Sequence, residues 1–275
     1  MRDNKNEKKI DRPVFAGIDI GSVTTKAVII NEQEDTLAFS LILTSYDRQQ
    51  SGADVLELAL REAGRPRDDI AYIVATGYGR RSISFADEVL PEIVCHARGT
   101  KLLFPEARTI IDIGGQDSKV IQLDSDGGVT KFEMNDKCAA GTGRFLEVLA
   151  ERILKTPVAE FGALALQSKA PCTLSSICTV FAESEIISLL SQHRTKEDIA
   201  YSMCISIAKR VISMGVGGQI SYQEPIVFSG GVAKNSGVIK AIEENLGKPV
   251  ITPEKQQITA ALGAAIFAKE RSNNA

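Results

Sequence analysis

The sequence predicts an α/β protein built from two related halves. The segment FAGIDIGSVTTK at 15–26 has a near-copy at 109–119, TIIDIGGQDSK. In both, an apolar β-branched run ends at an Asp, a glycine turn follows, and hydroxyl groups and a Lys lead into a second apolar run. Short β-branched runs bounded by turn residues are typical of strands, and stretches with helical periodicity separate them. The repeated pattern therefore indicates two half-molecules of one design.

Periodicity assigns the remaining elements. The first half is predicted to hold strands at 14–30 and 36–45, a helix at 52–63, a strand at 70–75 and a helix at 96–104. The second half is predicted to hold strands at 110–113, 120–123, 225–228 and 249–252, and helices at 140–154, 157–167, 179–191, 196–216, 236–246 and 258–269. We expect a disordered tail at 1–13, a first domain at 14–106 to which the C-terminal helix 256–275 returns, and a second domain at 107–255.

Composition excludes several classes of function. The net charge of −3 argues against a general binder of nucleic acid or anionic membranes. Aromatic residues make up 5% and Trp is absent, so a stacking platform for single strands is not expected. No apolar run approaches the roughly 20 residues that cross a bilayer, and Met1–Arg12 lacks the apolar centre of a secretory signal. We expect a cytoplasmic protein without a nucleic-acid or membrane partner.

Three glycine turns follow predicted strands and favour a nucleotide site. Glycine lets the backbone approach an anion closely, hydroxyls and amides donate to phosphate oxygens, and an Asp can hold a metal-bound water. The third turn, Val227–Asn235, precedes a helix, which suits a base and ribose lying over glycine backbone. The loop TGYGRR at 76–81 also follows a strand and carries two cations. It is predicted to lie near phosphate or at a partner surface. The alternative is an ordinary turn with solvated arginines.

The three turns resemble the first phosphate, second phosphate and adenosine motifs of the acetate kinase, sugar kinase, Hsp70 and actin superfamily, in the segments DIGS from Asp19, DIGG from Asp112 and SGGV from Ser229. This resemblance implies two ribonuclease-H-like domains around an ATP cleft, with Mg²⁺ held through water by Asp19 and Asp112. Gln116 and Asp117 become candidates for orienting the attacking water, with ordinary turn chemistry as their alternative. The implied ATP contacts are Gly21, Ser22, Thr24, Thr25, Lys26, Gly114, Gly115, Gly230, Gly231 and Lys234.

Two of the five cysteines are predicted to begin helices. Cys138 precedes the 140–154 helix and Cys178 precedes the 179–191 helix. A helix N-terminus stabilises a thiolate, and the small residues beside Cys138 leave room for an inorganic cluster. Two thiolates cannot complete a Cys₄ set, but a two-fold dimer presents four. Spacing alone leaves buried, packed thiols as the alternative.

The remaining cysteines and the histidines are given simpler roles. Cys172 is a weaker candidate ligand in a loop or strand entry, whereas Cys95 and Cys204 lie in apolar helical surroundings and are predicted to be core. His96 and His193 have no ligand-spaced companions and are predicted to lie on the surface.

A second resemblance covers about residues 14–270. The segments NDKCAAGTG at 135–143, SICTVFAESE at 176–185 and ATGYGR at 75–80 resemble the iron–sulfur ATPases that activate 2-hydroxyacyl-CoA dehydratases, of the BadF/BadG/BcrA/BcrD type. The resemblance implies a homodimer with one shared [4Fe–4S] cluster on Cys138 and Cys178. It implies that hydrolysis of ATP to ADP drives one electron to an iron–sulfur dehydratase or reductase component, with a ferredoxin or flavodoxin as donor.

Two other functions stay open from the residues alone. A small-molecule kinase of the same superfamily would use the nucleotide turns without a cluster. A non-catalytic nucleotide sensor would bind ATP with no reductant-dependent activity. Neither needs cysteines at helix starts, so iron content separates them from the iron–sulfur ATPase.

Overall fold

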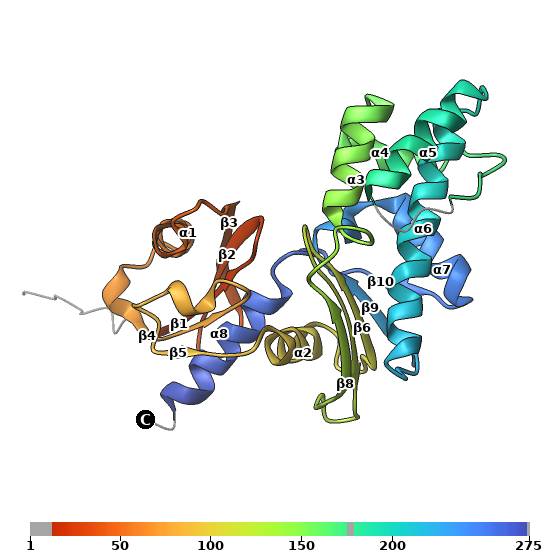
Figure 1. Ribbon diagram of the computed structural model, residues 1–275. Coiled ribbons are helices and arrows are strands. Elements are labelled where there is room, and N and C mark those ends of the chain that lie inside the picture. Colours follow the sequence, from red (N-terminus) through yellow and green to blue (C-terminus); the bar gives the residue numbers. More distant parts are fainter. Residues whose placement is uncertain (1–12, 175–178, 274–275) are drawn as a thin grey trace, which may run out of the picture. The chain divides into compact units, whose positions relative to one another are not determined.

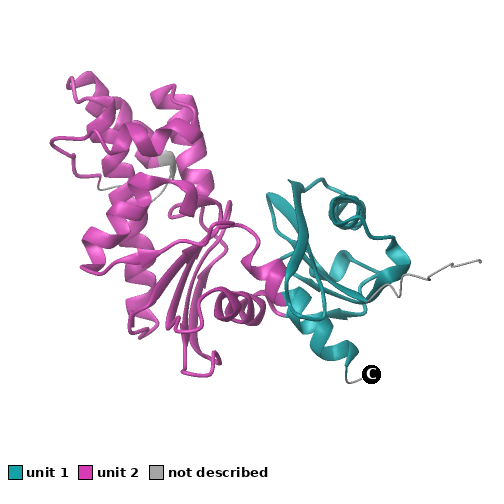
Figure 2. Cartoon of the chain, turned by 180° about the vertical axis from the view of Figure 1, so that it is seen from behind, with its two compact units in different colours: residues 1–90, 264–275 teal, residues 91–263 magenta. Residues whose placement is uncertain are grey.

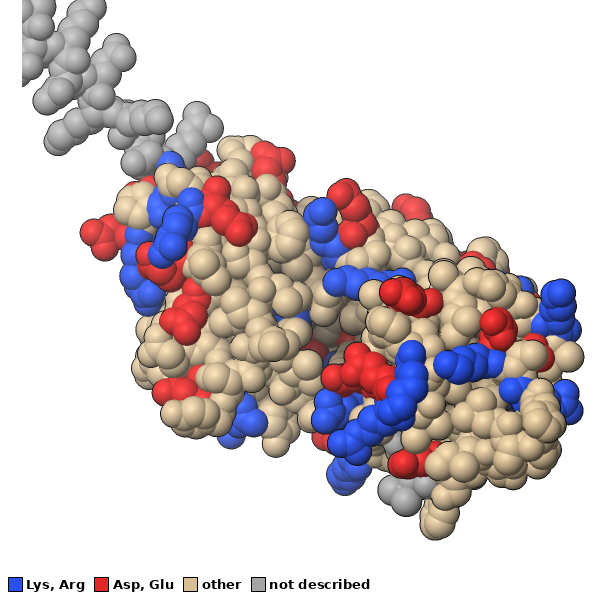
Figure 3. Space-filling view, turned by 90° about the horizontal axis from the view of Figure 1, so that it is seen from above, with Lys and Arg blue, Asp and Glu red and all other residues tan. Residues whose placement is uncertain are grey.

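The computed structural model describes residues 13–174 and 179–273, which fold into two compact units (Figure 2). Unit 1 comprises residues 1–90 and 264–275, and unit 2 comprises residues 91–263. Each unit is built on its own five-stranded mixed sheet. On the face shown in Figure 3, Lys and Arg side chains lie among Asp and Glu side chains, in keeping with the small net charge.

Unit 1 carries the first glycine turn on a sheet of order β3-β2-β1-β4-β5. The central strand β1 pairs antiparallel with β2 and parallel with β4. Helix α1 begins after the N-cap Asp47, ends at Gly64 in the left-handed conformation, and packs its Val55–Leu60 face against this sheet. The elements are β1 Val14–Ile20, β2 Thr24–Ile30, β3 Thr36–Leu43, α1 Arg48–Ala63, β4 Ile70–Thr76, β5 Glu88–Val89 and the later part of α8 Thr259–Ser272.

Unit 2 carries the second and third glycine turns on a sheet of order β10-β9-β6-β7-β8. Its central strand β6 pairs antiparallel with β7 and parallel with β9. Helix α2 covers one face of this sheet and α6 and α7 lie on the other (Figure 1). The elements are α2 Glu92–Leu103, β6 Thr109–Ile113, β7 Ser118–Leu123, β8 Val129–Asn135, α3 Gly143–Leu149, α4 Val158–Ala165, α5 Thr179–Ser191, α6 Lys196–Gly217, β9 Ile226–Ser229, α7 Ser236–Leu246 and β10 Val250–Ile251.

The two units share one topology around their central strands. In each, an antiparallel hairpin forms one side of the central strand, and a parallel strand from later in the chain forms the other. The predicted α/β protein of two related halves is therefore confirmed. Of the described helices, α6 is long and apolar enough to cross a membrane, but 56% of its apolar stretch is buried inside the protein, as in a core helix.

The compact units divide the chain at positions other than those expected from the sequence. The first boundary lies at residue 90 instead of 106, because α2 packs Ile93 and Ala97 against Ile110 and Ile121 of the second sheet. The second boundary lies within α8, since Gly263 approaches the α2 backbone so closely that any Cβ there would overlap the Cys95 carbonyl.

Several element boundaries also differ from the predictions. Helix α2 begins at Glu92, one turn before the predicted start, and α3 begins at Gly143 instead of 140 before passing into a π-helical turn at Ala150–Leu154. Strand β8 was not predicted, because its apolar residues Val129, Phe132 and Met134 do not alternate regularly with polar ones and are not buried.

Candidate functional site

The first glycine turn joins β1 to β2 and pairs an aspartate with a lysine. Asp19 and Lys26 are cross-strand partners, and Lys26 Nζ donates to Asp19 Oδ2 at 2.9 Å. The Gly21 amide donates to the Thr24 carbonyl at 3.1 Å and closes the turn. Asp19 is 4% exposed, and its Oδ1 has no hydrogen-bond partner among the described residues. A buried carboxylate oxygen is thus left available at this turn.

The 76–81 loop lies directly beside this aspartate. Gly77 has φ of +88°, and a Cβ on it would overlap Asp19 Oδ1. The Gly79 amide donates to the Ile20 carbonyl at 2.8 Å, and Arg80 Nη1 donates to the Gly77 carbonyl at 2.9 Å. Glycine is required here because a side chain would displace the Asp19 carboxylate or strain the backbone. The loop therefore belongs to the first turn.

The second glycine turn, between β6 and β7, repeats this geometry. Asp112 and Lys119 are cross-strand partners, as Asp19 and Lys26 are in unit 1. The Gly114 amide donates to the Asp117 carbonyl at 2.9 Å. Lys119 is 1% exposed, and such a buried ammonium requires compensating negative charge.

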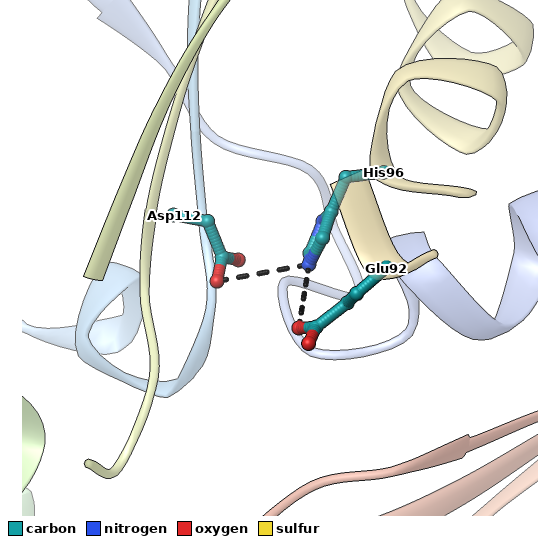
Figure 4. A group of neighbouring side chains, drawn as sticks. All are labelled: Glu92, His96 and Asp112. Atoms are coloured by element: carbon teal, nitrogen blue, oxygen red, sulfur yellow. Dashed lines mark hydrogen bonds and ion pairs between the residues drawn. The ribbon is translucent and has the colours of Figure 1, made fainter. Parts of the chain in front are cut away.

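Three carboxylates surround Lys119. Its Nζ lies 2.6 Å from Asp117 Oδ2, 2.8 Å from Glu92 Oε1 and 3.4 Å from Asp112 Oδ1. Both Glu92 and Asp112 also face His96 Nε2, at 3.3 Å and 3.7 Å (Figure 4). We call Glu92, His96, Asp112, Asp117 and Lys119 the buried charge cluster.

The prediction that His96 lies on the surface is wrong. His96 is 5% exposed, and its companion Glu92 stands one helical turn earlier on α2. The predicted helix began at His96, which hid the i, i+4 pair. Glu92, His96 and Lys119 are therefore site residues that sequence reasoning missed, although the spacing of Glu92 and His96 was a readable signal.

Mutual attraction sets the protonation states in the cluster. Burial alone would lower the pKa of His96, but the Asp112 carboxylate and the contact with Glu92 outweigh it and raise that pKa. Burial alone would raise the pKa of Asp112, but His96 and Lys119 hold it below its ordinary value. Burial also raises the pKa of Asp117, an effect that Lys119 only partly offsets. The cluster thus favours a charged imidazole, ammonium and Asp112 carboxylate together.

Glu92, His96 and Asp112 also have the donor types of a metal site. One ligand atom from each lies within 4.8 Å of the others. The Lys119 ammonium, however, lies within hydrogen-bonding distance of both carboxylates, and it already supplies the cation that this pair needs. The geometry therefore favours a charge cluster compensated by lysine and histidine.

The third glycine turn follows β9 and joins the second turn through Asp112. Ser229 Oγ donates to Asp112 Oδ2 at 2.8 Å. Gly230, with φ of +88°, packs against the Ile113 backbone so closely that a Cβ would overlap it, and its amide donates to the Gln256 carbonyl at 2.8 Å. The second and third turns are thus neighbours in unit 2.

The other predicted nucleotide residues fall into two groups. Those at turns or partly exposed positions are Gly21, Ser22, Thr24, Gly114, Gly115, Gln116, Gly231 and Lys234. Thr25 differs, since it is fully buried and its Oγ1 lies 2.9 Å from Thr44 Oγ1. Its hydroxyl is therefore engaged within unit 1.

Cys138 lies in the loop between β8 and α3, whereas the sequence predicts it at the start of the helix. The Asn135 side chain forms two hydrogen bonds with the Cys138 backbone. The Cys138 amide donates to Asn135 Oδ1 at 3.2 Å, and Asn135 Nδ2 donates to the Cys138 carbonyl at 2.8 Å. The helix begins only at Gly143, because Gly141 takes a left-handed φ of +84° that interrupts it. The thiol is free and partly buried.

The helix after this loop is bonded to the second glycine turn. The Gly143 amide donates to the Gly114 carbonyl at 2.9 Å, and the Arg144 amide donates to the Gly115 carbonyl at 2.8 Å. Two backbone hydrogen bonds thus join the start of α3 to the turn that carries Asp117.

The other cysteines divide as follows. Cys178 lies outside the described residues. Cys95 and Cys204 are fully buried, which confirms their prediction as core, and burial raises the pKa of the Cys204 thiol. Cys172 is partly buried, and its amide donates to Ser202 Oγ at 2.7 Å. His193 is exposed, as predicted.

Paired mixed sheets of one topology, with a glycine turn on each, are the fold of the actin, Hsp70 and sugar-kinase class. Solved structures agree: the chain superimposes on a ROK family glucokinase from Streptomyces griseus with a TM-score of 0.55 at 16% identity, covering 94% of this chain and 99% of that one. At this identity the likeness shows the fold alone.

Residues 16–268 match the BadF/BadG/BcrA/BcrD ATPase family, and the chain belongs to that family and is an ATPase. It is 46% identical to the 2-hydroxyisocaproyl-CoA dehydratase activator of Clostridioides difficile over 252 residues, 92% of this chain and 93% of that protein. It is 42% identical to the (R)-2-hydroxyglutaryl-CoA dehydratase activating ATPase of Acidaminococcus fermentans, over 93% and 97% of the two chains. A structure of the C. difficile activator with bound ADPNP superimposes with a TM-score of 0.89, at 45% identity and 95% and 96% coverage. The resemblance to dehydratase activators is confirmed.

Proposed function

We propose that this chain is a homodimeric, cytoplasmic iron–sulfur ATPase that drives low-potential electrons into a partner iron–sulfur enzyme. The observation that carries the proposal is the pair of backbone hydrogen bonds between the second glycine turn and the helix that follows the Cys138 loop. These bonds connect the second glycine turn to the helix that follows the Cys138 loop, which supports coupling between the nucleotide and that thiol. The similarity to dehydratase activators supports a 2-hydroxyacyl-CoA dehydratase or related reductase component as the acceptor.

In this proposal the glycine turns hold ATP·Mg²⁺. Asp19 fits magnesium, because its buried Oδ1 lacks a partner among the described residues and carboxylate oxygens are preferred by this ion, directly or through water. Asp112 is proposed to face the ion through water, because Ser229, Lys119 and His96 already engage its own oxygens. The phosphates contact the first and second turns and the adenosine contacts the third, through Gly21, Ser22, Thr24, Lys26, Gly114, Gly115, Gly230, Gly231 and Lys234. Thr25 is left out of this set, because it is fully buried and its hydroxyl is engaged by Thr44.

Hydrolysis requires a water held in line with the terminal phosphate. Gln116 is exposed in the second turn, which supports a role for its amide in orienting that water. Asp117 is instead held at 2.6 Å by Lys119, so we assign it mainly to fixing the turn. Its raised pKa also makes it a candidate proton acceptor during attack.

The proposed Cys₄ ligand set of a [4Fe–4S] cluster consists of Cys138 and Cys178 from each of two chains. Cys178 is assigned from the sequence, since it lies outside the described residues. At Cys138 the fit rests on a free, partly exposed thiol whose backbone is fixed by Asn135. Such a cluster supplies one-electron transfer, at a potential that hydrogen bonds and solvent exposure tune. A ferredoxin or flavodoxin is proposed as the donor.

In this proposal, the nucleotide is coupled to the Cys138 loop through backbone hydrogen bonds between the second glycine turn and α3. When the terminal phosphate binds or leaves, the Gly114–Asp117 turn shifts, and the bonds from Gly143 and Arg144 move the start of α3 with it. The Cys138 loop is attached to that helix and changes its surroundings in the same step. Two discrete arrangements of this kind are what nucleotide switches require.

The test is ATP-dependent activation of a purified 2-hydroxyacyl-CoA dehydratase, with dithionite as the reductant and no oxygen. Wild type should activate the enzyme only with hydrolysable ATP, whereas Cys138→Ala should keep ATP binding and lose activation. Cys204→Ser is the matched control at a buried core cysteine outside the proposed ligand set, and it should still activate. ATP turnover that depends on a small hydroxyl substrate, in a protein without iron, would support the kinase alternative instead.

A further inference from the structure

The aspartate of the second turn is held at both of its carboxylate oxygens by residues from three other elements. Ser229 of β9 donates to Oδ2 at 2.8 Å. Lys119 of β7 and His96 of α2 face Oδ1 at 3.4 Å and 3.7 Å. Asp112 itself is 4% exposed. The carboxylate therefore has little freedom to rotate about its Cβ–Cγ bond.

The holding groups are themselves fixed. Ser229 is fully buried at the end of β9, and Lys119 is oriented by Asp117 and Glu92. His96 is oriented by Glu92, which stands one turn away on the same helix (Figure 4). Glu92 thus aligns both cationic neighbours of Asp112, and none of these contacts uses an exposed side chain that solvent could easily displace.

Asp19 of the first turn is the equivalent carboxylate with fewer hydrogen-bond and ion-pair partners. The Asp19 carboxylate is bound by Lys26 at Oδ2, and its Oδ1 has no partner among the described residues. Both aspartates occupy the same position relative to their central strands. The additional partners of Asp112 are His96 and Ser229, which lie outside the duplicated turn.

We infer that Ser229 and His96 are positioning residues that fix the orientation of Asp112 for the nucleotide-bound magnesium ion. The inference rests on the proposed role of Asp112 at that ion. Partners that orient a metal-binding carboxylate contribute to affinity even though they never touch the metal. Ser229 carries the sharper test, because removing its hydroxyl changes no charge, whereas a change at His96 alters both orientation and charge.

The experiment measures Mn²⁺ binding to the oxidised, ADP-loaded protein by the loss of the free-ion paramagnetic resonance signal. Ser229→Ala should raise the Mn²⁺ dissociation constant about 10-fold, the lower end of the effect of losing such a partner. His96→Leu should raise it as well, and His96→Gln, which keeps an N–H donor for Glu92, should recover part of the loss. The Mg²⁺ concentration for half-maximal ATPase activity should shift in the same order, with a smaller change in kcat.

Thr109→Val is the matched control. Thr109 is also fully buried, lies on the same strand as Asp112, and donates its Oγ1 to the Gln223 carbonyl at 2.8 Å. This variant loses a comparable buried hydrogen bond at the opposite end of the strand, so it should lower thermal stability without changing Mn²⁺ affinity. If it weakened Mn²⁺ binding as much as Ser229→Ala did, general destabilisation would explain the effect and the inference would fail.

Asp112→Asn separates this inference from the proposed site. If Asp112→Asn weakens Mn²⁺ binding while Ser229→Ala and His96→Gln retain wild-type affinity, the positioning inference is overturned and the proposed role of Asp112 stands. If Asp112→Asn itself binds Mn²⁺ normally, that role fails and the inference fails with it. Should His96→Leu not fold, Ser229→Ala and His96→Gln decide the question.

Discussion

The first and second glycine turns begin from the same sequence pattern and reach different electrostatics. Each pairs an aspartate with a lysine across a hairpin, and each closes with one backbone hydrogen bond from its glycine. In the first turn Lys26 is 12% exposed and Asp19 keeps an oxygen without a partner among the described residues. In the second turn Lys119 is 1% exposed and Asp112 has partners at both oxygens.

The difference comes from residues outside the repeat. Helix α2 supplies Glu92 and His96, and β9 supplies Ser229, whereas the 76–81 loop brings glycine backbone to Asp19. A duplicated motif therefore does not predict duplicated chemistry. The first turn keeps a carboxylate oxygen without a partner among the described residues, and the second turn is bonded to the start of α3.

The largest predicted effect is the difference in unfolding free energy lost when each of the two lysines is replaced. Lys119→Met leaves three carboxylates and removes the buried ammonium that compensates them, so it should cost about 3–5 kcal/mol of unfolding free energy. Lys26→Met, at a partly exposed position, should cost less, about 1–3 kcal/mol. Urea denaturation measures both. Equal losses would contradict the contrast between the turns.

The next effect concerns the glycine beside Asp19. Gly77→Ala forces a side chain into the left-handed region, which costs roughly 1–2 kcal/mol, and pushes Asp19 Oδ1 away. Gly127→Ala has the same φ of +88° but meets only the flexible Lys101 side chain. Both variants should lower the melting temperature, but only Gly77→Ala should also weaken Mg·ATP binding, measured by calorimetry. Weaker binding in both would mean that backbone strain alone is responsible.

A smaller structural change should affect coupling. A Cβ on Gly143 would lie 3.1 Å from the Gly114 carbonyl and 3.3 Å from Val232 Cγ2, so α3 and the second turn would separate slightly. Gly143→Ala should change stability by less than about 1 kcal/mol, yet consume more ATP for each electron delivered. Gly217→Ala is the control, a helical position where the new Cβ meets no atom within 4 Å beyond its chain neighbours and the adjacent backbone of its own helix. An unchanged ratio of ATP to electrons would show that these bonds do not carry the signal.

The smallest effect is the pH dependence contributed by His96. Its folded pKa is raised above 6.5, so its stabilisation is complete below pH 6.5 and disappears as the pH rises through the folded value. Wild type should therefore lose stability relative to His96→Gln as the pH increases above 6.5. Denaturation of both proteins across this range measures the difference. A constant difference would mean that His96 does not change charge there.

Local sequence signals predicted most of the fold and part of the site. The apolar runs of β1 and β6 and the shared spacing of Asp19 to Lys26 and Asp112 to Lys119 are short-range features, so the sequence displays them directly. The contact between Ser229 and Asp112 joins residues far apart in the chain, and only sheet pairing brings them together. No spacing rule could have predicted it.

The error at His96 had a local cause. The Pro91 N-cap begins α2 at Glu92, and Glu92 and His96 then share one face of the helix. With the helix placed one turn late, His96 had no visible partner. Strand β8 was missed for a different reason, since an edge strand with mostly exposed side chains is stabilised by backbone pairing with β7 and needs little apolar pattern.

The most direct test of the central claim is the iron and acid-labile sulfide content of protein purified without oxygen. The account predicts about four irons and four sulfides for each pair of chains, with a visible absorption that bleaches on reduction by dithionite. Cys138→Ala should lose both, while ATP binding persists. Cys138→Ala protein that retained the full iron content, or wild-type protein that held none after reconstitution while still hydrolysing ATP, would contradict the shared cluster.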